Sequence, residues 1–263
     1  MKLKLLPLPA ILIYAWVVAA SAQNSIRIAA AADLEPVLPP ILEQFQKETG
    51  IHAEATYQAS AALTAQIQNG APFDVFLSAD LGYPQKLIAA GLAQGLGDGN
   101  TGTPITYARG TLVLWTRKDS HLGPLSISSL RRPEVQRIAI ANPDRAPYGR
   151  AAMAALRKTG LYDAVKSRLV TAENIAQAAQ FVDTGNADAG FLSLTSASTP
   201  RLKADGQYLV VPSDLYAPIE QGAVLIAKTE HRVEAKKFLV YLMSTPVQQG
   251  MRESGLTPAR PVP

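Results

Sequence analysis

The alternation of short apolar runs with amphipathic stretches is the feature that most constrains what this chain can fold into. Runs rich in Val, Ile and Ala predict strands at 26–31, 53–57, 75–79, 111–116, 137–141, 189–193, 208–212 and 223–227. Between them, apolar residues recur at helical spacing, and Gly70 and Gly160 stand where a helix C-terminus takes a left-handed residue. This pattern is typical of an α/β fold in which helices flank mostly parallel sheets.

Prolines set the expected limits of the first and last helices. Pro36, Pro39 and Pro40 follow the first strand closely, and none of them has an N–H. A helix there is therefore expected to be irregular or to start late. Near the C-terminus, apolar residues spaced along 233–243 predict a last helix, which Pro246 ends.

The first 22 residues predict a secretory signal peptide. Lys2 and Lys4 precede an apolar stretch, 5–20, and the small residues that close it form a cleavage site near Ala22. The apolar stretch is too short, and too interrupted by prolines, to predict a membrane anchor, although a retained N-terminal anchor is the alternative. We therefore expect an exported protein whose mature chain begins near Gln23.

Composition and length exclude several classes of protein. The chain has no cysteine, so disulfides, thiolate metal sites and a cysteine nucleophile are excluded. Its formal net charge is only +4 and no block of Lys and Arg stands out, which argues against a nucleic-acid-binding protein. Residues 23–263 are enough for one large domain or for two lobes of ordinary size, and we expect two lobes.

The motifs of several enzyme classes are absent or misplaced. A formal G-x-G-x-x-G match at 97–102 is followed by Pro104 and an expected strand, whereas a dinucleotide site needs a helix there, so a surface loop is predicted. The sequence has no G-x-S-x-G and no H-E-x-x-H. His52, His121 and His231 are isolated in polar segments, so neither a metal site nor a catalytic histidine is predicted.

Four turns, in which an apolar run leads into the start of an expected helix, are candidates for anion binding. They lie at 31–34, 58–63, 146–149 and 173–175. The first N–H groups of a helix have no partner within it, and the helix dipole places partial positive charge there. Taken singly, Ser60 and Asn174 are as easily ordinary helix caps, and Tyr148 a partly buried aromatic. Three of the four turns are expected at the carboxyl ends of strands, where ligands of open α/β sheets collect, and the four turns together predict an oxyanion site.

The residues in and around these turns match a known family. The most specific matches are the G-A-P-x-D-V-F-x-S-A-D run at 70–80 and the P-Y-G turn at 147–149. Further matches lie at 29–34, 60–67, 142–143, 173–175, 188–191 and 218–224. Through them the sequence resembles the periplasmic molybdate-binding proteins of molybdate ABC transporters, the ModA type, over nearly all of the chain after the signal peptide.

This resemblance implies a two-lobed type II periplasmic-binding fold with the ligand cleft between the lobes. Lobe 1 would be discontinuous, comprising 23–107 and 220–263, and lobe 2 would comprise 108–219. Each lobe would be a mostly parallel sheet flanked by helices. The two crossings, near Tyr107 and Ile219, would form the hinge on which the lobes close.

The resemblance also implies a function. A monomeric protein would capture molybdate, and tungstate, in the periplasm and deliver it to the permease of an ABC transporter, without catalysis, cofactor or nucleic acid. A fully deprotonated tetrahedral dianion only accepts hydrogen bonds, so a site built of donors admits it and disfavours protonated phosphate. Sulfate would be rejected by size, and molybdenum would be held only through its oxygens.

Carried over position by position, the resemblance assigns the anion contacts. They would be Ala32, Asp33, Ser60, Tyr148 and Ile175. Ser60 and Tyr148 would donate hydroxyl protons. The backbone N–H groups of Asp33 and Ile175, together with that of Ala61, would supply the other donors.

This chain departs from the family pattern near the expected site. Many members have Ser or Thr where this chain has Ala32, so one hydroxyl is missing and affinity is expected to fall roughly tenfold. The carboxylate of Asp33 would repel a dianion, so we expect it to turn away and cap nearby N–H groups. Some members offer a tyrosine near Gly190, where this chain has Phe191, and Tyr148 would stand in for it.

Three alternatives stay open on the sequence alone. The same fold could bind another anion, such as sulfate, chromate or a small organic anion. It could also serve as a ligand-sensing domain that signals to a partner. A periplasmic enzyme would need a nucleophile and a base, which the scattered histidines do not supply.

Overall fold

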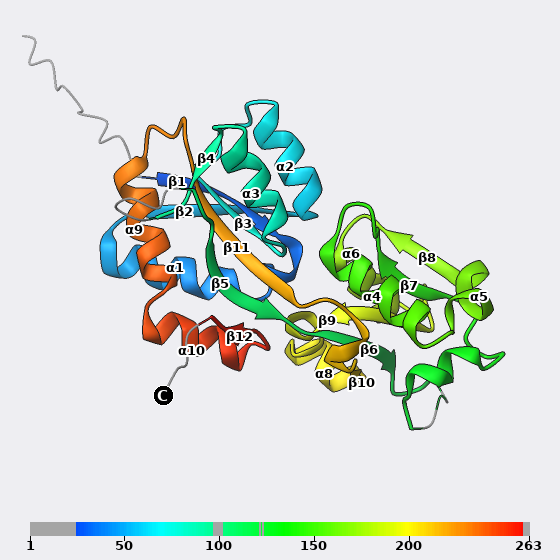
Figure 1. Ribbon diagram of the computed structural model, residues 1–263. Helices are drawn as coiled ribbons and strands as arrows, with labels where there is room; N and C mark the ends of the chain where they lie inside the picture. The colour runs from blue at the N-terminus through cyan, green and yellow to red at the C-terminus, as the bar shows by residue number, and fades with distance from the viewer. Residues whose placement is uncertain (1–24, 97–101, 121, 123, 260–263) are drawn as a thin grey trace, which may run out of the picture.

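The computed structural model describes residues 25–96, 102–120, 122 and 124–259. Two β-sheets, each flanked by helices, form two bodies that lie side by side (Figure 1). The predicted α/β class is confirmed. The predicted signal peptide, most of the 97–102 motif and His121 lie outside the described residues.

The first body is built on a seven-stranded sheet of order β12-β5-β11-β3-β1-β2, with β4 paired to β11. Its strands are β1 (Ser25–Ala31), β2 (His52–Gln58), β3 (Val75–Ser78), β4 (Ala93–Gln94), β5 (Ile105–Gly110), β11 (Ile219–Ile226) and β12 (Thr257–Pro258). Its helices are η1 (Ala32–Leu34), α1 (Leu38–Thr49), α2 (Ser60–Gln68), α3 (Gly82–Ala89), α9 (Arg232–Leu242) and α10 (Thr245–Glu253).

The second body is built on a five-stranded sheet of order β10-β6-β9-β7-β8. Its strands are β6 (Leu112–Arg117), β7 (Ile138–Ala141), β8 (Leu169–Ala172), β9 (Ala189–Ser193) and β10 (Gly206–Val210). Its α-helices are α4 (Pro147–Lys158), α5 (Tyr162–Val165), α6 (Ile175–Asp183), α7 (Leu194–Ala197) and α8 (Pro200–Asp205). Its 3-10 turns are η2 (Ile127–Arg131) and η3 (Lys166–Arg168), and η4 (Ser213–Leu215) lies on the way back to the first body.

Side-chain alternation along β1 explains why helices cover both faces of its sheet. Ile28 packs with α1, α9 and α10 on one face, whereas its neighbour Ala29 packs with α2 and α3 on the other. In the first cluster, the rings of Phe45 on α1 and Phe238 on α9 meet edge to face, with 5.3 Å between centroids. Residues 28–31 are buried and apolar, and Arg27 is exposed near the start of the strand. A strand with both faces buried is nearly continuously apolar, which is why the run 26–31 was readable from the sequence.

Both sheets are mixed, which corrects the prediction that they are mostly parallel. β1, β2 and β3 are parallel, and so are β7, β8 and β9. The remaining pairs, among them β5 with β11 and β6 with β10, are antiparallel. The physical reason is that β5, β6, β10 and β11 flank the two passages between the bodies, where the chain goes out and comes back along neighbouring paths.

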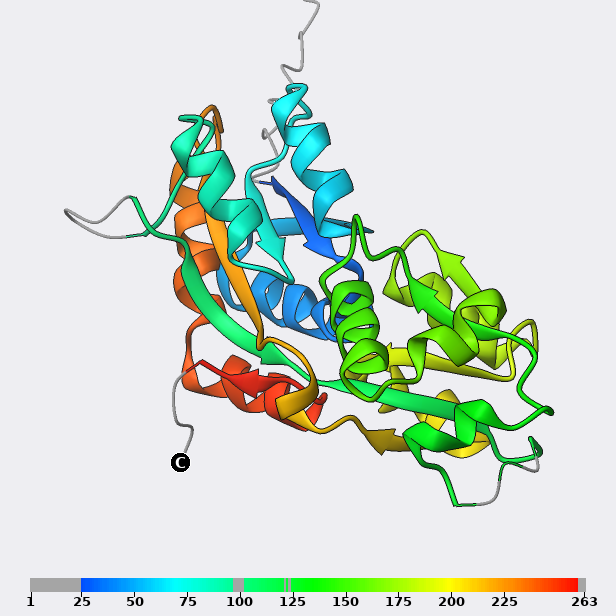
Figure 2. The same cartoon turned by 45° about the vertical axis from the view of Figure 1, so that its right-hand side comes forward.

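The chain crosses from one sheet to the other at Thr111, because β5 ends at Gly110 and β6 begins at Leu112. It returns between β10 and β11, and Figure 2 shows both connections on the same side of the molecule. We use lobe 1 for the described residues of 25–110 and 219–259, and lobe 2 for those of 112–210. The predicted division, with limits at 107/108 and 219/220, stays a prediction.

The helix limits follow the local signals. α1 begins only at Leu38 and carries Pro39 and Pro40 in its first turn, as the prolines predict. Gly70 and Gly160 adopt left-handed backbones, with φ of 84° and 66°. Pro246 does more than end the last predicted helix, since it lies in the first turn of α10, a separate helix. Across the described part of the chain, no helix has the length and apolarity needed to cross a membrane.

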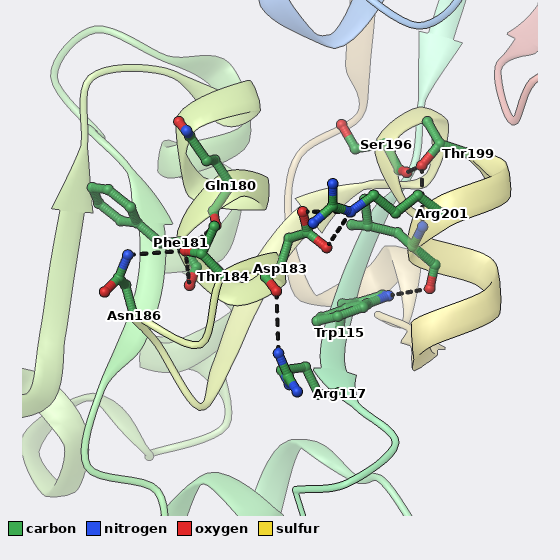
Figure 3. A network of polar contacts seen from close by, with 11 residues as sticks. Trp115, Arg117, Gln180, Phe181, Asp183, Thr184, Asn186, Ser196, Thr199 and Arg201 are labelled. Atoms are coloured by element: carbon green, nitrogen blue, oxygen red, sulfur yellow. Dashed lines mark hydrogen bonds and ion pairs between the residues drawn. The ribbon is translucent and has the colours of Figure 1, made fainter.

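A polar network fixes the C-terminal end of α6 within lobe 2 (Figure 3). Arg201 Nε of α8 donates to Asp183 Oδ1 over 3.1 Å, and Arg117 Nη1 of β6 donates to the backbone carbonyl of Asp183 over 3.3 Å. Trp115 Nε1 donates to the carbonyl of Leu202 over 3.2 Å. Cations interact favourably with the partial negative charge at a helix C-terminus, so these contacts anchor α6 at the end opposite Ile175.

Candidate functional site

The four candidate turns meet at one cavity between the lobes. It is lined by all five residues that the resemblance assigns, namely Ala32, Asp33, Ser60, Tyr148 and Ile175. None of the five is more than 3% exposed. The space open to the centre of a water molecule is about 10 Å³, roughly the room that one water needs. The lobes therefore lie closely against each other around this point.

The parallel strands explain why the turns converge. η1 follows β1, α2 follows β2, α4 follows β7 and α6 follows β8. Parallel neighbours end at the same edge of a sheet, and ligands of open α/β sheets collect outside the carboxyl ends of the strands. The two sheets turn these edges toward each other, so four chain segments far apart in sequence share one cavity.

Ser60 is oriented by a neighbouring loop. Its Oγ accepts a hydrogen bond from the N–H of Ala79, just after β3, over 3.1 Å. An oxygen that accepts in this way keeps its own proton for donation. The N–H of Ala61 is committed elsewhere, because it donates to the backbone carbonyl of Arg145 in lobe 2 over 3.2 Å. The predicted use of Ala61 as a cavity donor therefore does not fit this arrangement of the lobes.

Ile175 begins α6, and its N–H belongs to the first turn of that helix. Asn174 is the cap, with its Oδ1 accepting from the N–H of Gln177 over 2.9 Å. The first N–H groups of a helix have no acceptor within the helix, and this cap satisfies Gln177 rather than Ile175. A donor with partial positive charge thus lies at the cavity wall.

Asp33 does not turn away from the cavity, which differs from the expectation. Its Oδ2 accepts from the hydroxyl of Tyr148 over 3.0 Å and from Nε2 of Gln221 over 2.5 Å. The backbone N–H of Asp33, in the first turn of η1, also donates to this carboxyl group. The physical reason is burial, since a carboxyl group removed from water needs donors and these two side chains supply them.

Burial also changes the ionisation of these groups. Removal from water raises the pKa of Asp33 to about 6, against hydrogen bonds from Gln221, Tyr148 and its own backbone N–H, which lower it. Burial, reinforced by the charge of Asp33, raises the pKa of Tyr148 and that of Tyr107 well above the usual range. The Tyr148 hydroxyl therefore remains a donor at neutral pH.

Two residues of this cluster were not predicted as site residues from the sequence. Gln221 is fully buried on β11, and Thr195 on α7 donates its hydroxyl to the backbone carbonyl of Asp33 over 2.7 Å. The sequence offered one signal for Gln221, because it is a polar residue within the mostly apolar strand β11. It offered none for Thr195. With Tyr148, Thr195 connects lobe 2 to η1 of lobe 1.

An ion pair adds a further contact between the lobes. Nη2 of Arg150 on α4 lies 2.5 Å from Oδ2 of Asp80, and Nη1 of Arg150 donates to the hydroxyl of Tyr83 over 3.1 Å. Asp80 and Tyr83 belong to lobe 1. The two lobes are thus joined by charge on the surface and by hydrogen bonds inside.

The chemistry available to the cavity is that of hydrogen-bond donors. Neither Lys nor Arg is among the described residues that line it. Within the described ranges, no group of three or more His, Asp or Glu residues is placed to hold a metal ion. His52, one of the expected isolated histidines, contacts Gln46 and Glu54 on the surface of lobe 1. A small anion held by hydroxyls and helix starts suits this donor set.

Two lobes joined by two crossings, with a buried cavity between helix starts, define a solute-binding protein. The chain belongs to the family of bacterial extracellular solute-binding proteins, whose model matches residues 26–257. Its similarity to relatives confirms the resemblance to the ModA type. The molybdate-binding protein ModA of Azotobacter vinelandii is 39% identical to it, over 82% of this chain and 83% of the relative. ModA of Rhodobacter capsulatus is 34% identical, over 89% of both chains.

Solved structures agree with this family. The periplasmic molybdate-binding protein of Azotobacter vinelandii matches with a TM-score of 0.81 and 31% identity, covering 89% of this chain and 100% of the other. The sulfate-binding protein SubI of Mycobacterium tuberculosis matches with a TM-score of 0.75 at 18% identity, covering 90% of this chain and 88% of the other. The second likeness concerns the fold alone.

Proposed function

We propose that this protein binds molybdate, and tungstate, in the periplasm and hands it to the permease of an ABC transporter. The observation that carries the proposal is the convergence of four turns on one buried cavity, with the Ser60 hydroxyl and the start of α6 as donors. The relatives named as ModA support the same cargo. The anion contacts would be Ala32, Asp33, Ser60, Tyr148 and Ile175.

The selectivity follows from the donor set. Molybdate and tungstate are tetrahedral dianions that accept hydrogen bonds and donate none, so hydroxyl and N–H groups around the cavity satisfy them. Closure of the lobes removes water, which strengthens each of these bonds. The protein would act as a monomer, without a cofactor and without catalysis, and molybdenum would be contacted only through its oxygens.

A second cargo is favoured by one observation. Asp33 Oδ1 is a buried acceptor without a hydrogen-bond partner among the described residues. A carboxylate oxygen in a binding cavity can accept a hydrogen bond from a ligand that carries a proton. Hydrogen phosphate carries one at neutral pH and would find an acceptor there. The relatives favour molybdate, but phosphate belongs in the same titration as sulfate and chromate.

The test is calorimetric titration of the mature, anion-stripped protein with molybdate, tungstate, sulfate, phosphate and chromate. We expect tight binding of molybdate and tungstate, with sulfate and phosphate much weaker. Binding of phosphate or sulfate in preference to molybdate would replace the proposed cargo while leaving the fold class intact. Gel filtration with light scattering checks the monomer in the same samples.

The site assignment is tested with the double variant Ser60→Ala/Tyr148→Phe. Loss of two donors to a charged ligand is expected to weaken molybdate binding by at least about a hundredfold. The matched control is Ser213→Ala/Tyr208→Phe, which makes the same chemical changes at exposed positions. Unchanged affinity in the first variant would place the site elsewhere.

A further inference from the structure

The polar cluster beside the cavity has more acceptors than donors. Asp33 Oδ2 takes both the Tyr148 hydroxyl proton and the Nε2 proton of Gln221. Asp33 Oδ1 and Gln221 Oε1 are both buried, and neither has a hydrogen-bond partner among the described residues. Because a tyrosine hydroxyl has a single proton, Tyr148 cannot donate to Asp33 and to a bound anion at once.

A bound dianion makes this imbalance worse. It brings further acceptor oxygens and two negative charges into a cavity that Asp33 lines. Asp33 is fully buried, and an ionised carboxylate next to a dianion, with water excluded, is strongly disfavoured. With a dianion bound and Asp33 ionised, the cluster would therefore have one donor proton too few.

No cation among the described residues compensates for this charge. The titratable groups nearest to Asp33 are the phenols of Tyr148 on α4 and Tyr107 on β5. Ion pairs on the surrounding elements join Asp80 with Arg150, Arg109 with Glu220, Arg145 with Glu173, His52 with Glu54, and Arg201 with Asp183. Glu35 follows η1 directly and Arg27 lies on β1, but the groups that shift the pKa of Asp33 include no charged side chain. Tyr57 on β2 is affected by Glu35 rather than by Asp33.

We propose that Asp33 carries a proton when the oxyanion is bound, so that each anion enters together with one proton from solvent. The inference rests on the proposed function, the binding of a dianionic oxyanion. The proton turns Asp33 from an acceptor into a donor. The protonated carboxyl group then donates a hydrogen bond to the anion directly, or to the Tyr148 oxygen while the Tyr148 hydroxyl donates to the anion. In either case the net charge brought into the cavity falls by one.

Burial prepares the carboxyl group for this role. Burial already raises the pKa of Asp33 to about 6, and a dianion held beside the carboxyl group in a cavity without water raises this pKa further, to above the pH range tested below. A group whose pKa is raised by the ligand makes binding tighter at low pH. Above about pH 6, molybdate affinity is therefore expected to fall about tenfold for each pH unit.

The first experiment counts protons. Titration of the full mature protein with sodium molybdate at pH 7.5, in buffers of different ionisation enthalpy, is expected to show uptake of about one proton per anion. The dissociation constant measured between pH 6.5 and pH 8.5 is expected to rise about a hundredfold. The free anion stays fully deprotonated over this range, so the proton is bound by the protein.

The variant Asp33→Asn replaces the carboxyl group by a neutral group of the same shape that already carries donor protons. We expect it to bind molybdate without proton uptake, with an affinity that does not depend on pH and that exceeds the wild type at pH 8.5. Asp80→Asn is the matched control, because Asp80 lies in the contact between the lobes outside the cluster, and it is expected to keep the uptake of one proton.

Infrared difference spectra give a readout that does not depend on a variant folding well. Addition of molybdate to the wild type at pH 7.5 is expected to produce a protonated-carboxyl C=O band, which Asp33→Asn removes. Molybdate binding by the wild type with no proton uptake, a flat pH profile and no such band would overturn this inference alone. If the wild type binds molybdate at no pH, the proposed function fails and this inference fails with it.

Discussion

Gly110 and Tyr148 are packed so closely that residue 110 must be a glycine for the observed placement of the tyrosine. A Cβ built on Gly110 would lie 2.1 Å from the Tyr148 hydroxyl oxygen and 3.2 Å from Nε2 of Gln221. Gly110 ends β5 at the crossing between the lobes, whereas Tyr148 belongs to α4 of lobe 2. The crossing itself therefore helps to position a predicted anion contact.

The first prediction is that Gly110→Ala weakens molybdate binding by about tenfold to a hundredfold. The added methyl group overlaps the hydroxyl oxygen, so Tyr148 must move away from Asp33 and from the cavity. Gly250→Ala on α10 is the control, because a Cβ there meets no atom within 4 Å. Calorimetric titration measures both, and equal affinities would show that the position of Tyr148 does not matter for binding.

The second prediction concerns stability and pH in the anion-free protein. Because burial raises the pKa of Asp33 to about 6, its folded form holds a proton that the unfolded form has released, and the stability that it adds is lost as pH rises from about 4 to about 6. A shift of about two pKa units corresponds to about 3 kcal/mol. Urea unfolding of the wild type and of Asp33→Asn isolates this group. The difference between their free energies of unfolding is expected to change by about 3 kcal/mol as pH rises from about 4 to above 6. A constant difference would show that Asp33 has an ordinary pKa.

The parts of the site that the sequence predicted are those with local signals. Ser60 and Ile175 begin helices directly after strands, and the residue types that start helices are recognisable in a short window. Parallel strands end at a common edge, which brings together the turns within one sheet, whereas the meeting of the two sheets at one cavity was expected only from the family resemblance. β8 was not predicted, because Leu169 and Val170 are only partly buried, Thr171 is exposed, and the four residues of the strand form no long apolar run.

The parts that the sequence did not predict depend on contacts between distant segments. Gln221 and Thr195 reach Asp33 across 188 and 162 residues of chain, and no local pattern records such contacts. The orientation of Asp33 could not be predicted for the same reason, since its donors come from α4 and β11. Without them, capping of its own turn was the natural expectation.

The third prediction is that Ala32→Ser strengthens molybdate binding by about tenfold. Ala32 lines the cavity and is almost fully buried, so a hydroxyl there adds a donor to a charged ligand. Ala89→Ser, on the exposed end of α3, controls for the general effect of serine in a helix. Weaker binding by Ala32→Ser would mean that the cavity has no room for the added oxygen.

The fourth prediction is that Arg150→Ala lowers molybdate affinity only a few-fold and that the difference disappears at high salt. The Arg150–Asp80 pair joins the lobes, but its side chains are 42% and 32% exposed, and such pairs contribute about 1 kcal/mol or less. Arg109→Ala breaks a comparably exposed pair, with Glu220, inside lobe 1, so it is expected to leave affinity unchanged. Titrations at about 0.05 M and 1 M salt separate the two cases, because salt screens exposed charges. A loss in Arg150→Ala that persists at 1 M salt would show that Arg150 acts through its contact with Tyr83, which is not an ion pair.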